Sequence, residues 1–523
     1  MHNRLKILGI KSKSESSVFK DYFSTDHLRT GLKTRALRGA TATIIAQVSV
    51  FCIQTIGTII LARLLTPDDF GLVTMVLAIS LLLQNFGVNG FTEAVIQREE
   101  INHKQISTLF WINVCFSVML ALLFIASSSV IVWFYKEPRL KLIVMAISGS
   151  IILSGLSTQH LALLMRKMEF YKISVNGAVA AVISVTISIF LAWRGWGYWA
   201  LVAKWVVSPL AVTAGGWVLC RWRPGLPSGG AGVGPMVRFA GNTYGNFVVS
   251  YFSRNLDRIL IGRFLGAAPL GYYDRAYHLS NVLPNQITSP LNGVAISAFS
   301  RLTAEPEKYR KNFFCVLSIL AFFGMPLSAA LTLISEDLIF LLLGPQWHIA
   351  GHIFFAFGPS IGVGVLYITH GWLHVSLGTP DRWFRWGIIG LIVTASCFAA
   401  GLSYGVIGVA VAYTVSTYVL IGPALWYAGK PINLKLSSVL SAVWKYYVAA
   451  VGAGLFCWFV LYSYELTSNI FISFNIIARI LISVVLCLCI YLALIVAMYQ
   501  GVKPITQFIS VLREMIPRRF PGE

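Results

Sequence analysis

From residue 242 to residue 263 the chain reads Asn242-Thr-Tyr-Gly-Asn246-Phe-Val-Val-Ser250-Tyr-Phe-Ser-Arg254-Asn-Leu-Asp257-Arg258-Ile-Leu-Ile-Gly-Arg263, a stretch of membrane-helix length with charge in its middle. On a helix, which advances about 100° per residue, its polar residues collect on one face. They are Asn242, Asn246, Ser250 and Asp257, with Arg254 and Arg258 beside them. Because an ionisable side chain at bilayer depth costs at least ~2.5 kcal/mol, such a face normally turns toward a bundle interior or a watery cavity. The pattern predicts a substrate-facing helix, and the alternative is a charged cluster that only holds neighbouring helices together.

The composition places the chain in a membrane. Of its 523 residues, 57% are hydrophobic and 12% are charged, and the mean hydropathy is +0.73. A soluble domain carries about 25% charged residues. Apolar blocks long enough to cross the hydrocarbon core recur from about residue 39 to residue 498, and we count about fourteen of them. The sequence therefore predicts an all-α polytopic membrane protein with about 14 transmembrane helices.

The formal net charge of +21 is a signal of topology. Residues 1–38 form a basic tail without the apolar core and cleavage site of a signal peptide, and residues 501–523 form a second basic tail. With both tails in the cytoplasm, most Lys and Arg residues fall on the cytoplasmic side, as the positive-inside rule requires. The basic residues are scattered over short loops, so we expect no nucleic acid partner.

A Gly- and Pro-rich connector, residues 221–238, separates two similar halves, and its composition predicts a flexible cytoplasmic linker. The segment from Ala62 to Leu72 aligns without a gap on the segment from Gly262 to Tyr272, at an offset of 200 residues. A repeat of this kind indicates duplication. It predicts an N-lobe of six spans in residues 39–220 and a C-lobe of six spans in residues 239–430, followed by two further spans in residues 431–500.

Other predicted spans carry polar stripes that a helix surrounded by lipid does not need. The stripe positions are Gln47 and Gln54 in the first span, Asn85, Asn89 and Glu93 in the second, and Asn281, Asn285 and Asn292 in the eighth. In the eighth span we expect Pro284 and Pro290 to interrupt the helix, as in the broken helices that line transporter cavities. Glu93 and Asp257 are the membrane carboxylates suited to ion coupling.

Signatures of catalysis are absent from the sequence, which has no P-loop, GxSxG elbow or HExxH pair. No loop outside the predicted spans is long enough for a catalytic domain, and none of the eight cysteines forms a CxxC pair. We therefore expect no enzymatic activity, no cofactor and no metal. Two lobes with polar helix faces are the layout of an alternating-access transporter.

The segment Leu256-Asp257-Arg258-Ile-Leu-Ile-Gly262-Arg263, followed by Leu270-Gly271-Tyr272-Tyr273, resembles the signature of a transporter family. The family is the polysaccharide transporter (Wzx/WzxC-type) branch of the multidrug/oligosaccharidyl-lipid/polysaccharide (MOP) flippase superfamily. Ala62-Arg63-Leu64-Leu65 with Phe70-Gly71 is similar to it as well. The resemblance covers roughly residues 37–430 and says nothing about the identity of the sugar.

This resemblance implies a flippase for undecaprenyl-diphosphate-linked oligosaccharide repeat units in the bacterial inner membrane, serving exopolysaccharide, capsule or O-antigen synthesis. It implies two six-helix lobes and two C-terminal helices, with a polysaccharide polymerase and export machinery as possible partners. Arg254 and Arg258 suit the diphosphate head group, and the Asn, Gln and Ser stripes suit sugar hydroxyls.

Two alternatives stay open. A cation-coupled exporter of small molecules from the same superfamily would use Glu93 or Asp257 for coupling. A membrane polysaccharide polymerase or ligase would also be polytopic, but it would be expected to carry a sizeable extracytoplasmic loop.

Overall fold

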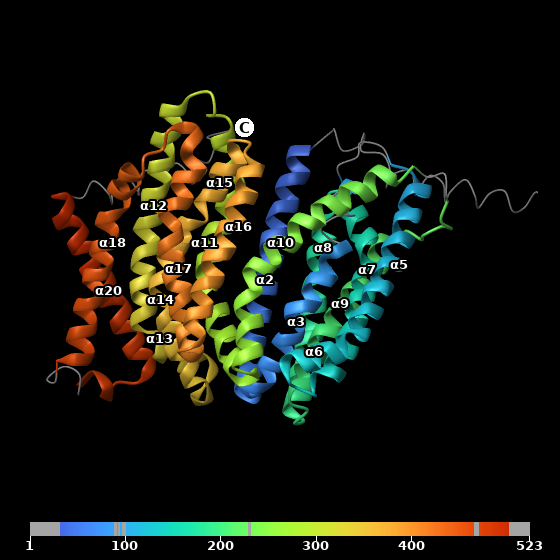
Figure 1. Ribbon diagram of the computed structural model, residues 1–523, viewed down its shortest axis with the longest axis horizontal. Helices are drawn as coiled ribbons and strands as arrows, with labels where there is room; N and C mark the ends of the chain where they lie inside the picture. Colours follow the sequence, from blue (N-terminus) through green and yellow to red (C-terminus); the bar gives the residue numbers. More distant parts are fainter. Residues whose placement is uncertain are drawn as a thin grey trace, which may run out of the picture. The chain divides into compact units, whose positions relative to one another are not determined.

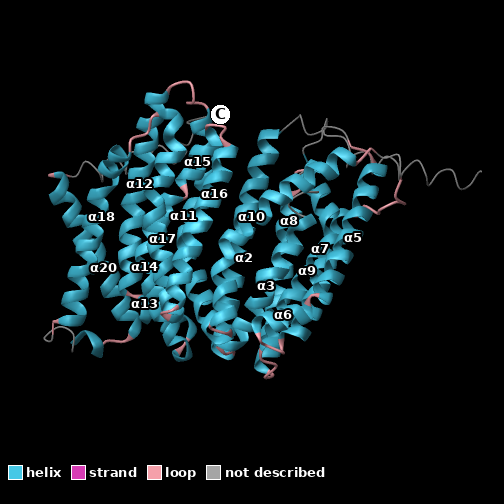
Figure 2. Cartoon of the chain, in the orientation of Figure 1, coloured by secondary structure: helices cyan, strands magenta, loops and turns pink. Residues whose placement is uncertain are grey.

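The structure of the chain is a computed structural model that describes residues 32–87, 92, 95–96, 101–228, 232–464 and 470–501. Over these residues the chain is helical and has no strand (Figure 1, Figure 2). Twelve of the described helices are long and apolar enough to cross a membrane, which confirms the predicted all-α polytopic membrane protein. The predicted seventh and eighth spans fall on two further long helices outside those twelve, so the total of fourteen stays a prediction.

The first of two compact units is Met1–Gly271. Its helices are α2 (Leu32–Leu64), α3 (Pro67–Gly87), α5 (His103–Ala126), α6 (Ser128–Tyr135), α7 (Leu140–Arg166), α8 (Phe170–Trp193), α9 (Tyr198–Cys220) and α10 (Gly234–Phe264). α7 packs against α3, α5 and α9, and is the central helix of the unit (Figure 1). α10 packs on α3 and α6, so this compact unit extends beyond the lobe boundary predicted at residues 221–238. The assignment of lobes by the repeat stays a prediction.

The second unit is Tyr272–Glu523. It contains most of α11 (Ala267–Ser300), then α12 (Pro306–Leu333), α13 (Ser335–Leu343), η3 (Pro345–Trp347), α14 (His348–Tyr367), α15 (Thr369–Ser376), α16 (Pro380–Leu402), α17 (Gly405–Gly429), η4 (Lys430–Ile432), α18 (Leu436–Trp458), the π-helical segment η5 (Phe459–Ser463) and α20 (Ile476–Tyr499). α12 packs on α14, α14 on α17, and α16 on α17. The first unit contains the same three pairings, α5 on α7, α7 on α9 and α8 on α9, which supports an internal repeat. α18 and α20 pack on α12.

The offset of 200 residues also appears in the helix ends. α2 ends at Leu64 and α10 at Phe264, while α3 begins at Pro67 and α11 at Ala267. The repeat predicted from sequence therefore marks equivalent helix boundaries in the two copies.

The starts of α3 and α11 also touch each other inside the first unit. A Cβ atom added to Gly71 would lie 1.8 Å from the carbonyl oxygen of Ala267, and one added to Gly271 would lie 1.9 Å from that of Pro67. Real Cβ atoms essentially never come within 3.0 Å of another atom, so both positions require glycine. Because residues 267 and 271 are the repeat equivalents of 67 and 71, the contact is symmetric.

The first part of the connector is held on α5, although its composition predicts a flexible linker. Trp222 is fully buried, and its Nε1 donates to Nδ1 of His103 at 3.1 Å. The backbone N–H of Gly225 donates to Oγ of Ser107 at 2.9 Å, and its carbonyl oxygen accepts from Nε1 of Trp111 at 2.9 Å. Residues 221–228 have no regular secondary structure, but these bonds fix their course.

The expected interruption of the eighth span is wrong. α11 is a continuous helix from Ala267 to Ser300 and includes Pro284 and Pro290. A proline removes one backbone hydrogen bond, and nearby Ser or Thr hydroxyls satisfy carbonyl groups in membrane helices. The carbonyl groups that lose an N–H donor here are those of Ser280 and Gln286, four residues before each proline, and the hydroxyl of Thr288 adds a side-chain bond to the carbonyl oxygen of Pro284 at 2.9 Å.

Candidate functional site

Arg258, beside the polar face of α10, is joined by hydrogen bonds to Asn255 and Asp257. Nδ2 of Asn255 donates to the carbonyl oxygen of Tyr251 at 2.9 Å, and Oδ1 of Asn255 accepts from Nη1 of Arg258 at 2.7 Å. The Asp257 carboxylate accepts the backbone N–H of Arg258 at 2.8 Å. The hydroxyl of Tyr251 donates to the carbonyl oxygen of Leu77 at 3.3 Å, which ties α10 to α3. Asn255 therefore positions the Arg258 guanidinium.

The two charged residues of this face differ in burial. Asp257 is 3% exposed, whereas Arg258 is half-buried. A buried carboxylate is stable only when it is paired or hydrogen-bonded, so the burial favours a positioning role for Asp257. The guanidinium has five N–H donors in a planar arrangement that matches phosphate oxygens. Arg258 is thus the described residue of this face that is best suited to bind an anion.

The polar positions of α2 and α3 lie in the first unit. Gln47 and Gln54 are exposed on α2, and Asn85 is half-buried on α3. Nδ2 of Asn85 donates to the carbonyl oxygen of Leu81, one turn earlier in the same helix, at 2.7 Å. These residues provide amide groups on helices of membrane length, as the sequence predicts.

The polar positions of α11 have different surroundings. Nδ2 of Asn281 donates to the carbonyl oxygen of Tyr277 at 2.9 Å, and Asn285 is exposed. Oδ1 of Asn292 accepts from Nε1 of Trp372 at 2.6 Å. The side-chain oxygen of Asn292 therefore links α11 to α15 within the second unit.

The remaining predicted site residues belong to parts of the chain whose side chains the structure does not describe. The side chains of Asn89, Glu93, Asn242, Asn246, Ser250 and Arg254 lie outside the described residues. The backbone at four of these positions, Asn242, Asn246, Ser250 and Arg254, belongs to α10. Among the described residues, no group of three or more His, Cys, Asp or Glu side chains is arranged to hold a metal ion.

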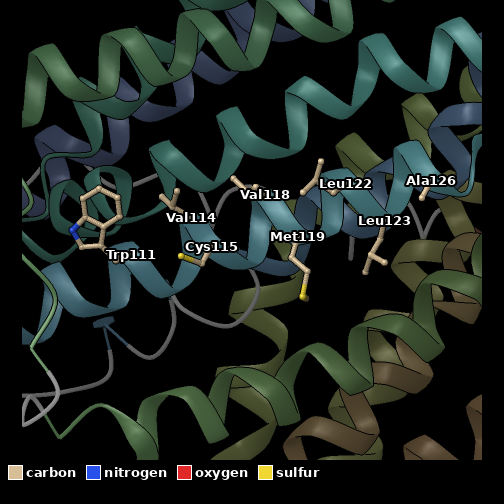
Figure 3. A pocket seen from close by; sticks show the side chains of 8 residues that line it. All are labelled: Trp111, Val114, Cys115, Val118, Met119, Leu122, Leu123 and Ala126. Carbon is tan, nitrogen blue, oxygen red and sulfur yellow. The ribbon is translucent and has the colours of Figure 1, made fainter.

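An apolar groove of about 570 Å³ follows α5 (Figure 3). It is lined by Trp111, Val114, Cys115, Val118, Met119, Leu122, Leu123 and Ala126. The distance along the helix from the first to the last of these is about 22 Å at a rise of 1.5 Å per residue. The indole N–H of Trp111 is used by the connector. Such a surface suits a hydrocarbon chain and offers little to a sugar.

Sequence reasoning missed the aromatic cluster under the connector. The ring of His160 stacks on Trp217 with centroids 4.4 Å apart, and Trp222 meets His160 edge-on at 5.2 Å. One signal was present, because a tryptophan in a Gly- and Pro-rich stretch needs a place to bury its large apolar surface.

Comparison with known proteins relates this architecture to polysaccharide synthesis. The family model described as "Polysaccharide biosynthesis protein" matches residues 60–351. The lipopolysaccharide biosynthesis protein WzxC of Escherichia coli (strain K12) is 27% identical over 323 residues, which are 61% of this chain and 65% of that protein. The succinoglycan biosynthesis transport protein ExoT of Rhizobium meliloti (strain 1021) is 23% identical over 359 residues, 68% of this chain and 72% of that protein.

The fold is also that of a solved structure. The lipid II flippase MurJ, in an inward closed conformation, matches with a TM-score of 0.70 at 14% identity, covering 89% of this chain and 99% of that chain. The chain spans slightly less than two thirds of WzxC, while the family model covers more than half of the chain. The predicted resemblance to polysaccharide transporters of the WzxC type is confirmed, and the chain belongs to the polysaccharide biosynthesis protein family.

Proposed function

We propose that the chain is a flippase that moves undecaprenyl-diphosphate-linked oligosaccharide repeat units across the bacterial inner membrane for exopolysaccharide, capsule or O-antigen assembly. The family match and the description of ExoT as a transport protein support this proposal. Translocation involves binding and release of the substrate by alternating access, without a covalent change.

The observation that carries the proposal is the oriented guanidinium of Arg258 on α10. Its Nη1 is fixed by Oδ1 of Asn255 at 2.7 Å, and further N–H donors of the same group suit a diphosphate. Asp257 beside it offsets one positive charge, so we expect Arg254 to supply the net positive charge for an anionic head group. The stripes on α2, α3, α10 and α11 supply amides and hydroxyls for the sugars.

The proposal also covers the lipid tail of the substrate, the membrane topology, the partner proteins and the residues for ion coupling. The lipid tail stays in apolar surroundings, for which the groove along α5 offers a surface. Both chain ends lie in the cytoplasm, and the protein works beside a polysaccharide polymerase and export machinery. Glu93 and Asp257 are the residues we propose for ion coupling.

The test is to delete the gene, extract the undecaprenyl-linked lipids and determine on which membrane face complete repeat units accumulate. We expect accumulation on the cytoplasmic face together with loss of polymer. Complementation with Arg258→Ala should leave this defect in place, whereas Arg301→Ala should restore export. Arg301 is a matched control, because it is an exposed arginine that follows α11.

Accumulation of unpolymerised units on the outer face would show that translocation is intact and would favour the polymerase alternative. Normal export by Arg258→Ala at wild-type protein levels would show that the head group is held elsewhere. Glu93→Gln keeps the shape of the side chain and removes its charge. Export that is unchanged in this variant under imposed ion gradients would contradict a coupling role for Glu93.

A further inference from the structure

The second unit contains a pocket of about 640 Å³ between α14 and α17, to which α13 and the end of α18 also contribute. Unlike the groove along α5, this pocket combines ionisable groups at one end with apolar walls. The residues that matter for its chemistry are Glu336, His352, Phe355, Ile407, Val411 and Trp458. None of them belongs to the polar stripes proposed for the substrate.

The ionisable end of the pocket is a pair of exposed side chains. Nδ1 of His352 lies 3.1 Å from Oε1 of Glu336, and the two side chains are 52% and 66% exposed. The neighbouring carboxylate of Asp337 is occupied by an ion pair with Arg479. Glu336 is therefore the carboxylate that faces the pocket.

The walls extend from this end along two helices. From His352 to Pro359 on α14, and from Ile407 to Thr414 on α17, each wall runs for about 10 Å. Thr414 adds little polarity, because its hydroxyl already donates to the carbonyl oxygen of Ala356 at 2.7 Å. The walls thus match the first part of a hydrocarbon chain.

Trp458 lies where α18 gives way to the π-helical segment η5. π-helical turns occur frequently at functional sites, and tryptophan is enriched where apolar chains meet head groups. The residue is 51% exposed. A tryptophan in this position can cover the boundary between the head group and the chain of a bound amphiphile.

We propose that this pocket binds a membrane phospholipid with a primary ammonium head group, namely phosphatidylethanolamine. The ammonium pairs with Glu336, and the first part of an acyl chain lies along Phe355, Ile407 and Val411. An anionic lipid is disfavoured by charge repulsion, because its phosphate would lie next to the Glu336 carboxylate and it has no ammonium group to compensate. A free sugar is disfavoured as well, because its hydroxyls would lie against apolar walls without hydrogen-bond partners.

The test uses the purified full-length chain and native mass spectrometry. Binding of phosphatidylethanolamine is compared with binding of phosphatidylglycerol of the same acyl composition. Because the charged end is exposed, we expect a preference of about two- to fivefold for phosphatidylethanolamine, the range of an exposed ion pair. Glu336→Gln should abolish this preference. Glu307→Gln, which changes an exposed glutamate at the start of α12 in the same way, should keep it.

A second variant tests the apolar wall. Val411→Trp should reduce phosphatidylethanolamine binding, and a photoactivatable phosphatidylethanolamine should label peptides of α14 and α17 in the wild type. Equal binding of the two lipids to the wild type, or a preference that survives in Glu336→Gln, would overturn the proposal. So would labelling confined to other helices. The lipid-extraction test of flipping reports on a different property, so failure here would leave that proposal standing.

Discussion

Replacing Gly271 by alanine tests the contact between the two copies of the repeat. The new methyl carbon would lie 1.9 Å from the carbonyl oxygen of Pro67, and ordinary van der Waals contact begins near 3.4 Å. The opposing atom belongs to the backbone of α3 and cannot rotate aside as a side chain can. The starts of α3 and α11 would therefore have to separate by about 1 Å or more.

Two effects of opposite sign determine how much the free energy of unfolding changes in Gly271→Ala. Overpacking that shifts the backbone costs typically about 1–3 kcal/mol, and this contact belongs at the upper end because two helix ends must move. Alanine in place of glycine in a helix returns up to about 1 kcal/mol. We therefore expect a net loss of about 2 kcal/mol. Gly71→Ala should lose a similar amount, because its added Cβ would lie 1.8 Å from the carbonyl oxygen of Ala267.

The assay is thermal unfolding of the purified protein in detergent, together with polymer export in cells. Gly149→Ala is the matched control, because Gly149 lies in α7 and an added Cβ there meets no atom within 4 Å. Gly271→Ala should unfold at a lower temperature than the wild type, while Gly149→Ala should unfold at the same or a higher one. An unchanged unfolding temperature for Gly271→Ala would refute the reasoning. An equal fall in the control would do the same.

Three further substitutions test other described contacts. Arg258→Lys keeps the charge and loses the planar fork, so export should fall while an immunoblot of the membrane fraction shows normal protein levels. Trp222→Ala should cost about 3–5 kcal/mol, the usual range for a buried tryptophan, and should speed proteolysis within residues 221–228. Arg479→Ala leaves the carboxylate of Asp337 buried without its partner and should cost about 3–5 kcal/mol. Adding Asp337→Asn should recover part of that loss, measured by the unfolding temperature.

The helices could be predicted from hydropathy, because a helix that crosses the hydrocarbon core needs about 20 mostly apolar residues. Among the apolar blocks expected between residues 39 and 498, the segments containing α17, α18 and α20 are long and apolar enough to cross a membrane, and the polar stretch that begins at Asn242 forms one helix, α10. Helix starts were less predictable. α16, for example, begins at Pro380, and its first turn contains Asp381 and Arg382. Such a turn is helical without being apolar, so hydropathy leaves it out.

Partners could not be predicted, because a pattern shows that a polar group needs a partner but not which one. Trp372 donates to Asn292 across 80 residues, and Trp222 donates to His103 across 119. No local periodicity connects such residues. The same limit applies to Asp257, whose place in a stripe suggested a cavity and whose 3% exposure shows burial.

The glycines Gly71 and Gly271 show what an internal repeat adds to the interpretation of a sequence. At a contact between unlike segments, one glycine is enough to let two backbones approach. Where two copies of the same segment meet symmetrically, each copy presents both the glycine and the carbonyl that it must accommodate, so glycine is needed twice. Gly71 meets Ala267 and Gly271 meets Pro67 in this way. Two glycines at one repeat offset, each at the start of a helix, are therefore a sequence signal for a symmetric backbone contact. The signal needs no alignment of relatives, and the Gly71→Ala and Gly271→Ala pair tests it directly, since a symmetric contact must give both variants a similar loss.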